Sequence, residues 1–127
     1  MRFVVDLIKR EGRKEKLYFV RILLYYIYPR AFICRSETGK LYIFYEVMSR
    51  NDIDTWLVAE ITEKERVTLE NGSIPIQGLY SSDHDVFSVS YNHEKEASSA
   101  SYDLDDTESL VRRLPKNPVY REIYQTP

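Results

Sequence analysis

The chain of 127 residues has the usual length of one domain, and its 43% hydrophobic and 30% charged residues fit a globular rather than a disordered protein. Its longest apolar run, residues 22–28, is far shorter than the ~20 residues of a membrane-spanning helix, and the N-terminal segment lacks the sustained apolar region of a secretory signal. The single cysteine excludes an internal disulfide framework and a multi-cysteine zinc site. We therefore expect one cytoplasmic domain covering residues 1–127.

The net charge of −2 is unevenly spread along the chain. Residues 1–50 hold 11 Lys and Arg against 5 Asp and Glu, whereas residues 51–127 hold 7 against 15. A basic front and an acidic rear can steer association with a partner. Two separately solvated faces are the simpler interpretation, and we favour it.

The elements expected in the first half of the chain are strands. Residues 3–8 and 16–28 fit a hairpin around a charged loop that contains Gly12, although a helix over residues 2–10 fits the apolar spacing as well. Pro29 removes a ladder donor and predicts a bend or a sheet edge. Strands then follow at residues 31–35, 41–48 and 55–61, and the short polar turns between them predict an antiparallel meander.

The second half of the chain mixes helix and strand signals. Thr62 and Glu65 match a capping box, which predicts a short helix over residues 63–70. A turn of helix or an irregular connection follows around Pro75, and residues 86–91 alternate as a strand with one wet face. Residues 92–106 are small and polar and predict a mobile loop, after which Asp105 and Glu108 predict a capped helix over residues 107–114.

The strands at residues 16–28 and 41–48 are apolar on both faces. A solvated sheet face alternates with polar residues, so two apolar faces imply that both are covered. The covering comes from the short helices and the tail, or from another protein. The fold class is therefore α+β and mainly β: an antiparallel meander sheet of five to six strands with one or two short helices packed on it.

Four stretches between residue 22 and about residue 120 stand in a particular order: LLYYIYPRAFICRSETGKLYIFYEV, TWLVAEI, LENGSIPI and RRLPKNPVY. This order resembles that of a family of small bacterial domains of unknown function. The resemblance implies a β-rich domain. It implies no activity and no site residues.

Sequence motifs for catalysis are absent. Phosphate-binding loops, dinucleotide-binding loops, the serine hydrolase elbow and the zinc protease motif all lack their signatures. His84 and His93 stand at opposite ends of one expected strand, roughly 30 Å apart at ~3.3 Å per residue, so we interpret them as solvated loop residues rather than as one metal site. Cys34 shares a face with Phe32 and is expected to be a buried core residue. Asp52 and Asp54 fit a hairpin turn.

The remaining candidates form a basic surface with aromatic neighbours. We expect any binding contacts at the break near Pro29 and in the charged loop, from Arg13, Lys14, Tyr28, Arg30 and Arg35. The function expected is a non-enzymatic protein-interaction or small regulatory module of a bacterial or phage system, without cofactor or metal, whose partner is another protein or a second copy in a homodimer. A nucleic-acid or nucleotide-binding module is the alternative, weakened by a pI near 5.7. An enzyme with an unrecognised site is a further alternative.

Overall fold

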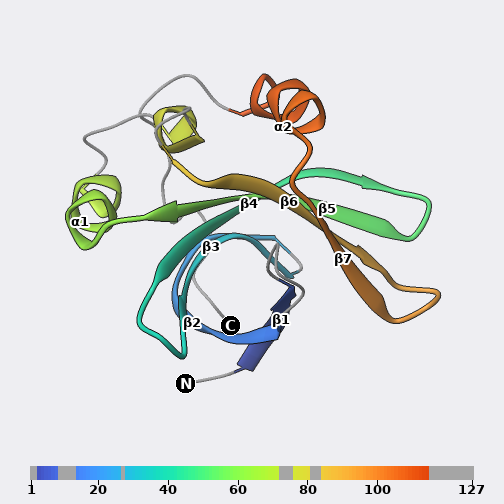
Figure 1. Cartoon of the computed structure of the whole chain (residues 1–127), viewed down its shortest axis with the longest axis horizontal. Coiled ribbons are helices and arrows are strands. Elements are labelled where there is room, and N and C mark those ends of the chain that lie inside the picture. The colour runs from blue at the N-terminus through green and yellow to red at the C-terminus, as the bar shows by residue number, and fades with distance from the viewer. Residues whose placement is uncertain (1–2, 9–13, 27, 72–75, 81–83, 115–127) are drawn as a thin grey trace.

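The computed structural model describes residues 3–8, 14–26, 28–71, 76–80 and 84–114 (Figure 1). These residues form one antiparallel sheet whose seven strands follow one another in chain order. The strands are β1 (Phe3–Ile8), β2 (Lys14–Tyr26), β3 (Tyr28–Ser36), β4 (Leu41–Arg50), β5 (Ile53–Ile61), β6 (Val86–Asn92) and β7 (Ala97–Ser101). The mainly β meander expected from the sequence is confirmed. Its seven strands are one more than the upper limit of the five to six expected.

Three helical elements lie on one side of this sheet: α1 (Glu63–Glu70), the 3-10 helix η1 (Ile76–Tyr80) and α2 (Leu104–Val111) (Figure 1). The capping box at α1 is present, because the Glu65 N–H donates to the Thr62 hydroxyl and the Thr62 N–H donates to the Glu65 carboxylate. The helix predicted over residues 63–70 is thus confirmed. Within the described residues, no helix has both the length and the apolar character needed to cross a membrane.

The N-terminal segment and the region around Pro29 differ from two of the expectations. Residues 3–8 pair with β2 as strand β1, so the alternative of a helix over residues 2–10 is wrong. Strand β2 ends at Tyr26, and β3 already begins at Tyr28, so Pro29 lies inside β3 rather than between two strands. The register is irregular at this point, since Tyr25 pairs with Pro29 and Leu24 with Ala31, so β3 takes two steps where β2 takes one. A bulge is where a sheet tolerates proline.

The polar segment at residues 92–106 contains a strand instead of the loop expected there. Residues 97–101 pair with β6 as strand β7, after a turn that contains Glu96 at a φ of 50°. Residues 97–101 are Ala and Ser, and they show no alternation of apolar and polar side chains. The strand therefore forms because the segment pairs with the outer edge of β6, and not because its residues favour β structure. Helix α2 begins at Leu104, and its cap is Asp103 rather than Asp105, because the Asp106 N–H donates to Asp103 Oδ1 at 3.2 Å.

Two clusters of buried side chains lie on opposite faces of the sheet. One face, here called the helix face, packs against α1, η1 and α2. The hydroxyl of Tyr80 in η1 lies 3.0 Å from the carbonyl oxygens of both Ile43 and Leu57. The opposite face, here called the curled face, buries Leu17, Phe32, Cys34, Tyr42, Phe44, Val58, Phe87 and Val89. The expectation that both faces of the sheet are covered is met by the chain itself.

The curled face is closed by the curvature of the sheet. Strands β1 to β4 wrap round in Figure 1, and the edge strands β1 and β7 come into contact without pairing. Phe32 stacks on Phe44, with ring centroids 4.9 Å apart, inside this curve. The β4–β5 and β6–β7 hairpins extend beyond the curled half (Figure 1), and their ends carry the site described next.

Candidate functional site

Of the five site residues predicted from the sequence, the structure describes the side-chain contacts of Arg30 and Arg35. Arg13 lies outside the described residues, and the structure places Lys14 and Tyr28 only as strand residues of β2 and β3. Arg30 pairs with Glu46 of β4, and Arg35 pairs with Glu63 of α1. These two arginines face opposite sides of the sheet, because α1 covers the helix face whereas Glu46 stands opposite Trp56 on the curled face.

A hollow of about 580 Å³ lies at the ends of the two projecting hairpins. We call it the Asp54 hollow, and its lining residues are Ser49, Arg50, Asn51, Asp52, Asp54, Trp56 and His93. Its position depends on a tight turn between β4 and β5, in which Asn51 and Asp52 adopt φ values of 53° and 63°. Asn and Asp tolerate this left-handed conformation better than other side chains do.

A β-bulge places Ser49 on the same face as Asp54. Glu46 stands opposite Trp56 and Ser49 opposite Asp54, so β4 uses three steps where β5 uses two. In a regular strand, Glu46 and Ser49 would point to opposite faces, because they are three positions apart. The bulge therefore brings a hydroxyl to the carboxylate.

Asp54 is the centre of a hydrogen-bond network. The Ser49 hydroxyl donates to Asp54 Oδ1 at 2.6 Å, and His93 Nε2 lies 2.6 Å from Asp54 Oδ2. The Asp54 side chain is only 9% exposed, whereas that of His93 is 54% exposed. The backbone N–H of His93 donates to the Asp52 carbonyl, and the Tyr91 ring meets the imidazole edge to face at 4.7 Å. Two strands and two hairpin turns thus hold the His93 ring.

The environment of Asp54 keeps its carboxyl group ionised at neutral pH. Burial by itself raises the pKa. Hydrogen bonds from Ser49 and His93 and the charges of His93 and Arg30 lower the pKa by more than burial raises it, so it lies below its ordinary value of 3.8. An ionised carboxylate only accepts hydrogen bonds. His93 Nε2 therefore donates the hydrogen bond to Asp54 Oδ2.

Trp56 lines the same hollow and has an unused donor. Its indole Nε1 atom is buried, and it has no hydrogen-bond partner among the described residues. A buried donor without an acceptor costs about 1–3 kcal/mol. The ring itself is held against Phe32, with centroids 6.5 Å apart. The Asp54 hollow therefore combines a fixed carboxylate, a hydrogen-bonded imidazole and an unsatisfied N–H.

A protein-family model matches residues 7–117, which include the described strands β2 to β7, all three helical elements and every residue of the Asp54 hollow. The chain belongs to DUF6575, a family of unknown function. No curated protein and no solved structure matches the chain. Membership of DUF6575 accordingly assigns neither a reaction nor a ligand to the hollow.

The second histidine of this DUF6575 chain lies in a separate hollow of about 500 Å³. His84 Nε2 is 2.5 Å from Glu65 Oε2, and its side chain is only 14% exposed. The interpretation as a solvated loop residue is therefore wrong for His84, whereas His93 lies in a turn with its side chain 54% exposed, as expected, and also bonds a carboxylate. Within the described part of the chain, no three His, Cys, Asp or Glu residues converge on a metal position. His84 joins α1 to the start of β6.

Sequence reasoning placed Asp54 in a turn and missed its meeting with His93. The two residues are 39 positions apart, and their contact follows from the pairing of Ile53 with Asn92 across β5 and β6. The sequence did contain one signal for this contact. The alternation of β6, continued two residues past Tyr91, places His93 on the same face as Tyr91. The prediction of Cys34 as a core residue is confirmed, since it is fully buried on the curled face.

Proposed function

We propose that this protein is a non-enzymatic protein-interaction module and that the Asp54 hollow is its contact surface. The observation that supports this most strongly is the buried, unpartnered N–H of Trp56 beside the Asp54–His93 pair. A volume of about 580 Å³ falls within the range of ligand sites, and the hairpin ends around it are exposed. Ile53, one of the two large exposed hydrophobic residues among those described, stands at the same end of β5.

The chemistry of the hollow favours binding over catalysis. A serine nucleophile requires a base strong enough to remove its proton, and the group to which the Ser49 hydroxyl donates is Asp54. The lowered pKa of Asp54 makes it a weak base at neutral pH. His93 uses Nε2 for the same carboxylate. The described side chains are thus arranged to fix one another and to present donors and acceptors to a partner.

The partner we propose is another protein, bound through a short segment that enters the hollow. A second copy of this chain and a nucleic acid are the competing occupants. The ion pairs of Arg30 and Arg35 on opposite faces support a protein partner over an oligonucleotide, since a phosphate chain needs cations along one path. The cytoplasmic location expected from the sequence stays a prediction, and the free, buried thiol of Cys34 fits it.

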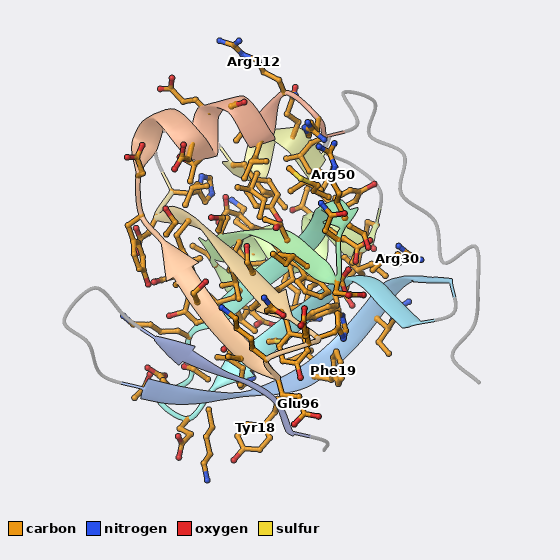
Figure 2. The ribbon with its side chains drawn as sticks, turned by 90° about the vertical axis from the view of Figure 1, so that its right-hand side faces the viewer. Tyr18, Phe19, Arg30, Arg50, Glu96 and Arg112 are labelled. Atoms are coloured by element: carbon orange, nitrogen blue, oxygen red, sulfur yellow. The ribbon has the colours of Figure 1, made fainter. Side chains whose placement is uncertain are left out.

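Selection of binding peptides tests this function. The immobilised protein is panned against a displayed library of random peptides, and the enriched sequences are synthesised and titrated in solution. We expect micromolar binding that falls about tenfold in Arg50→Glu, because Arg50 lines the hollow. Arg112→Glu makes the same change of charge just after the end of α2, where Figure 2 shows Arg112 pointing away from the molecule. This control variant should bind as the wild type does.

Three outcomes would contradict the proposal. The first is that no peptide is enriched over an unrelated protein. The second is that Arg50→Glu and Arg112→Glu weaken binding equally, which would indicate a general charge effect. The third is that an oligonucleotide binds at about 50 mM salt, or that light scattering shows a stable dimer, while no peptide binds.

A further inference from the structure

Helix α1 has very little apolar surface with which to pack on the sheet. Within Glu63–Glu70 only Leu69 is buried, and the other apolar residue, Val67, is 46% exposed. A surface helix usually buries a stripe of three or four apolar residues in every two turns. Helix α2 follows this rule more closely, since Leu110 and Val111 both pack against the core of the helix face. Helix α1 therefore needs another means of attachment.

Ion pairs provide that attachment from three directions. Three carboxylates of α1 pair with bases in β2, in β3 and just before β6: Glu70 with Arg21 at 3.4 Å, Glu63 with Arg35 at 3.7 Å and Glu65 with His84 at 2.5 Å. Within the helix, Arg66 pairs with both Glu63 and Glu70. Five side chains thus form one continuous charge chain from β2 along α1 to β3: Arg21, Glu70, Arg66, Glu63 and Arg35.

The charge chain is accessible to the ions of the solvent. The side chains of Arg21 and Arg35 are 43% and 42% exposed, and that of Glu63 is 57% exposed. Salt screens such charges, because the Debye length falls from about 10 Å at ~0.1 M salt to about 3 Å at ~1 M. One exposed ion pair contributes little to stability, whereas several charges in a network act together. Salt therefore weakens the attachment of α1 more than the apolar packing of α2.

We infer that α1 is a lid held by charge, which opens from the helix face as a unit and opens more often as the ionic strength rises. Segments with few buried apolar contacts are the ones that open locally while the rest of the fold stays intact. Opening withdraws Leu69 from the helix-face core and separates Arg21 and Arg35 from their carboxylates. The lid follows the end of β5, at one margin of the molecule in Figure 1, whereas Asp54 lies near the start of that strand. It is a conformational device separate from the Asp54 hollow.

Amide hydrogen exchange in ¹⁵N-labelled protein measures the opening of each helix. Reporters in α1 include the Arg66 N–H, which donates to the Thr62 carbonyl at 3.0 Å, and in α2 the Thr107 N–H, which donates to the Asp103 carbonyl at 3.1 Å. We expect protection of the α1 amides to fall about tenfold between ~20 mM and ~1 M NaCl. Protection of the α2 amides should change less than about twofold over the same range.

A matched pair of variants connects the salt effect to the charge chain. Glu70→Gln removes the carboxylate that Arg21 and Arg66 share. We expect it to lower the protection of the α1 amides about fivefold at ~20 mM NaCl and to make their salt dependence smaller than in the wild type. Glu108→Gln makes the same change at an exposed position of α2 and should leave the α1 amides as they are.

Four results would overturn the inference. In the first, the α1 amides exchange as slowly as those of Ile43 and Leu57 in the core, which means that the helix opens only with the whole fold. In the second, they exchange too fast to follow even at low salt, so that nothing holds the lid. In the third, α1 and α2 lose protection equally as salt is added. In the fourth, Glu70→Gln keeps the full salt dependence of the wild type.

Discussion

At the scale of single residues, Asp54 carries the most information about the site, because it is buried, ionised and doubly hydrogen-bonded. We expect Asp54→Asn to lower the free energy of unfolding by about 1–3 kcal/mol at pH 7, since an amide oxygen replaces a charged acceptor. Urea denaturation measures this difference. Asp52→Asn makes the same charge change two residues away in the exposed turn, where Asn accepts the positive φ, and should cost little.

The loss of stability in Asp54→Asn should depend on pH in a defined direction. The pKa of Asp54 in the folded chain lies below its ordinary value of 3.8, so the unfolded chain binds more protons than the folded one around that pH. Its contribution to stability is therefore complete above the ordinary value and is lost as the pH falls through the folded pKa. The difference between the wild type and Asp54→Asn should shrink below about pH 4. A constant difference from pH 7 to pH 3 would show that folding does not lower the pKa of Asp54.

At the scale of elements, the capping box of α1 is the device most open to test. Removing the hydroxyl in Thr62→Ala leaves the Glu65 N–H without its acceptor and should lower the free energy of unfolding by about 1 kcal/mol. Thr62→Ser keeps the hydroxyl and should retain most of that stability. Equal losses in the two variants, measured by urea denaturation, would mean that the cap hydrogen bond does not hold the helix.

A helix or strand could be predicted from the sequence where its signal lies within a few neighbouring residues. The capping box spans four residues, and the helix that it predicts has the observed bounds. Strand β7 has no such signal, because residues 97–101 become a strand only through pairing with β6. The bulge in β4 depends on its partner strand in the same way, and the Ser49–Asp54 contact depends on the bulge.

Arg30 and Arg35 are close in the sequence but lie on opposite faces of the sheet. An odd spacing along a strand points two side chains to opposite faces, so neighbouring positions in a sequence need not share one surface. The two arginines are five residues apart in β3, and their partners Glu46 and Glu63 belong to different faces. The meeting of Asp54 and His93 could not be predicted in this way, since it requires the register between β5 and β6.

At the scale of the whole molecule, closure of the curled face determines the chemistry of Cys34. Its thiol is fully buried among Phe32, Tyr42 and Phe44, and burial raises its pKa far above the ordinary value. A raised pKa keeps the thiol protonated, and only the thiolate attacks disulfide reagents. We expect Cys34 to resist Ellman's reagent in the native protein and to react rapidly in urea. Fast reaction under native conditions would show that the sheet opens along its curled face.

The central claim is that recognition takes place at the ends of the β4–β5 and β6–β7 hairpins. The most direct test maps the amide shift changes that a selected peptide causes in ¹⁵N-labelled wild-type protein. We predict that the largest changes fall on residues 49–56 and 91–93, together with the Trp56 indole peak. Changes confined to α1 and the Arg35 end of β3, with the Trp56 peak unmoved, would contradict the claim.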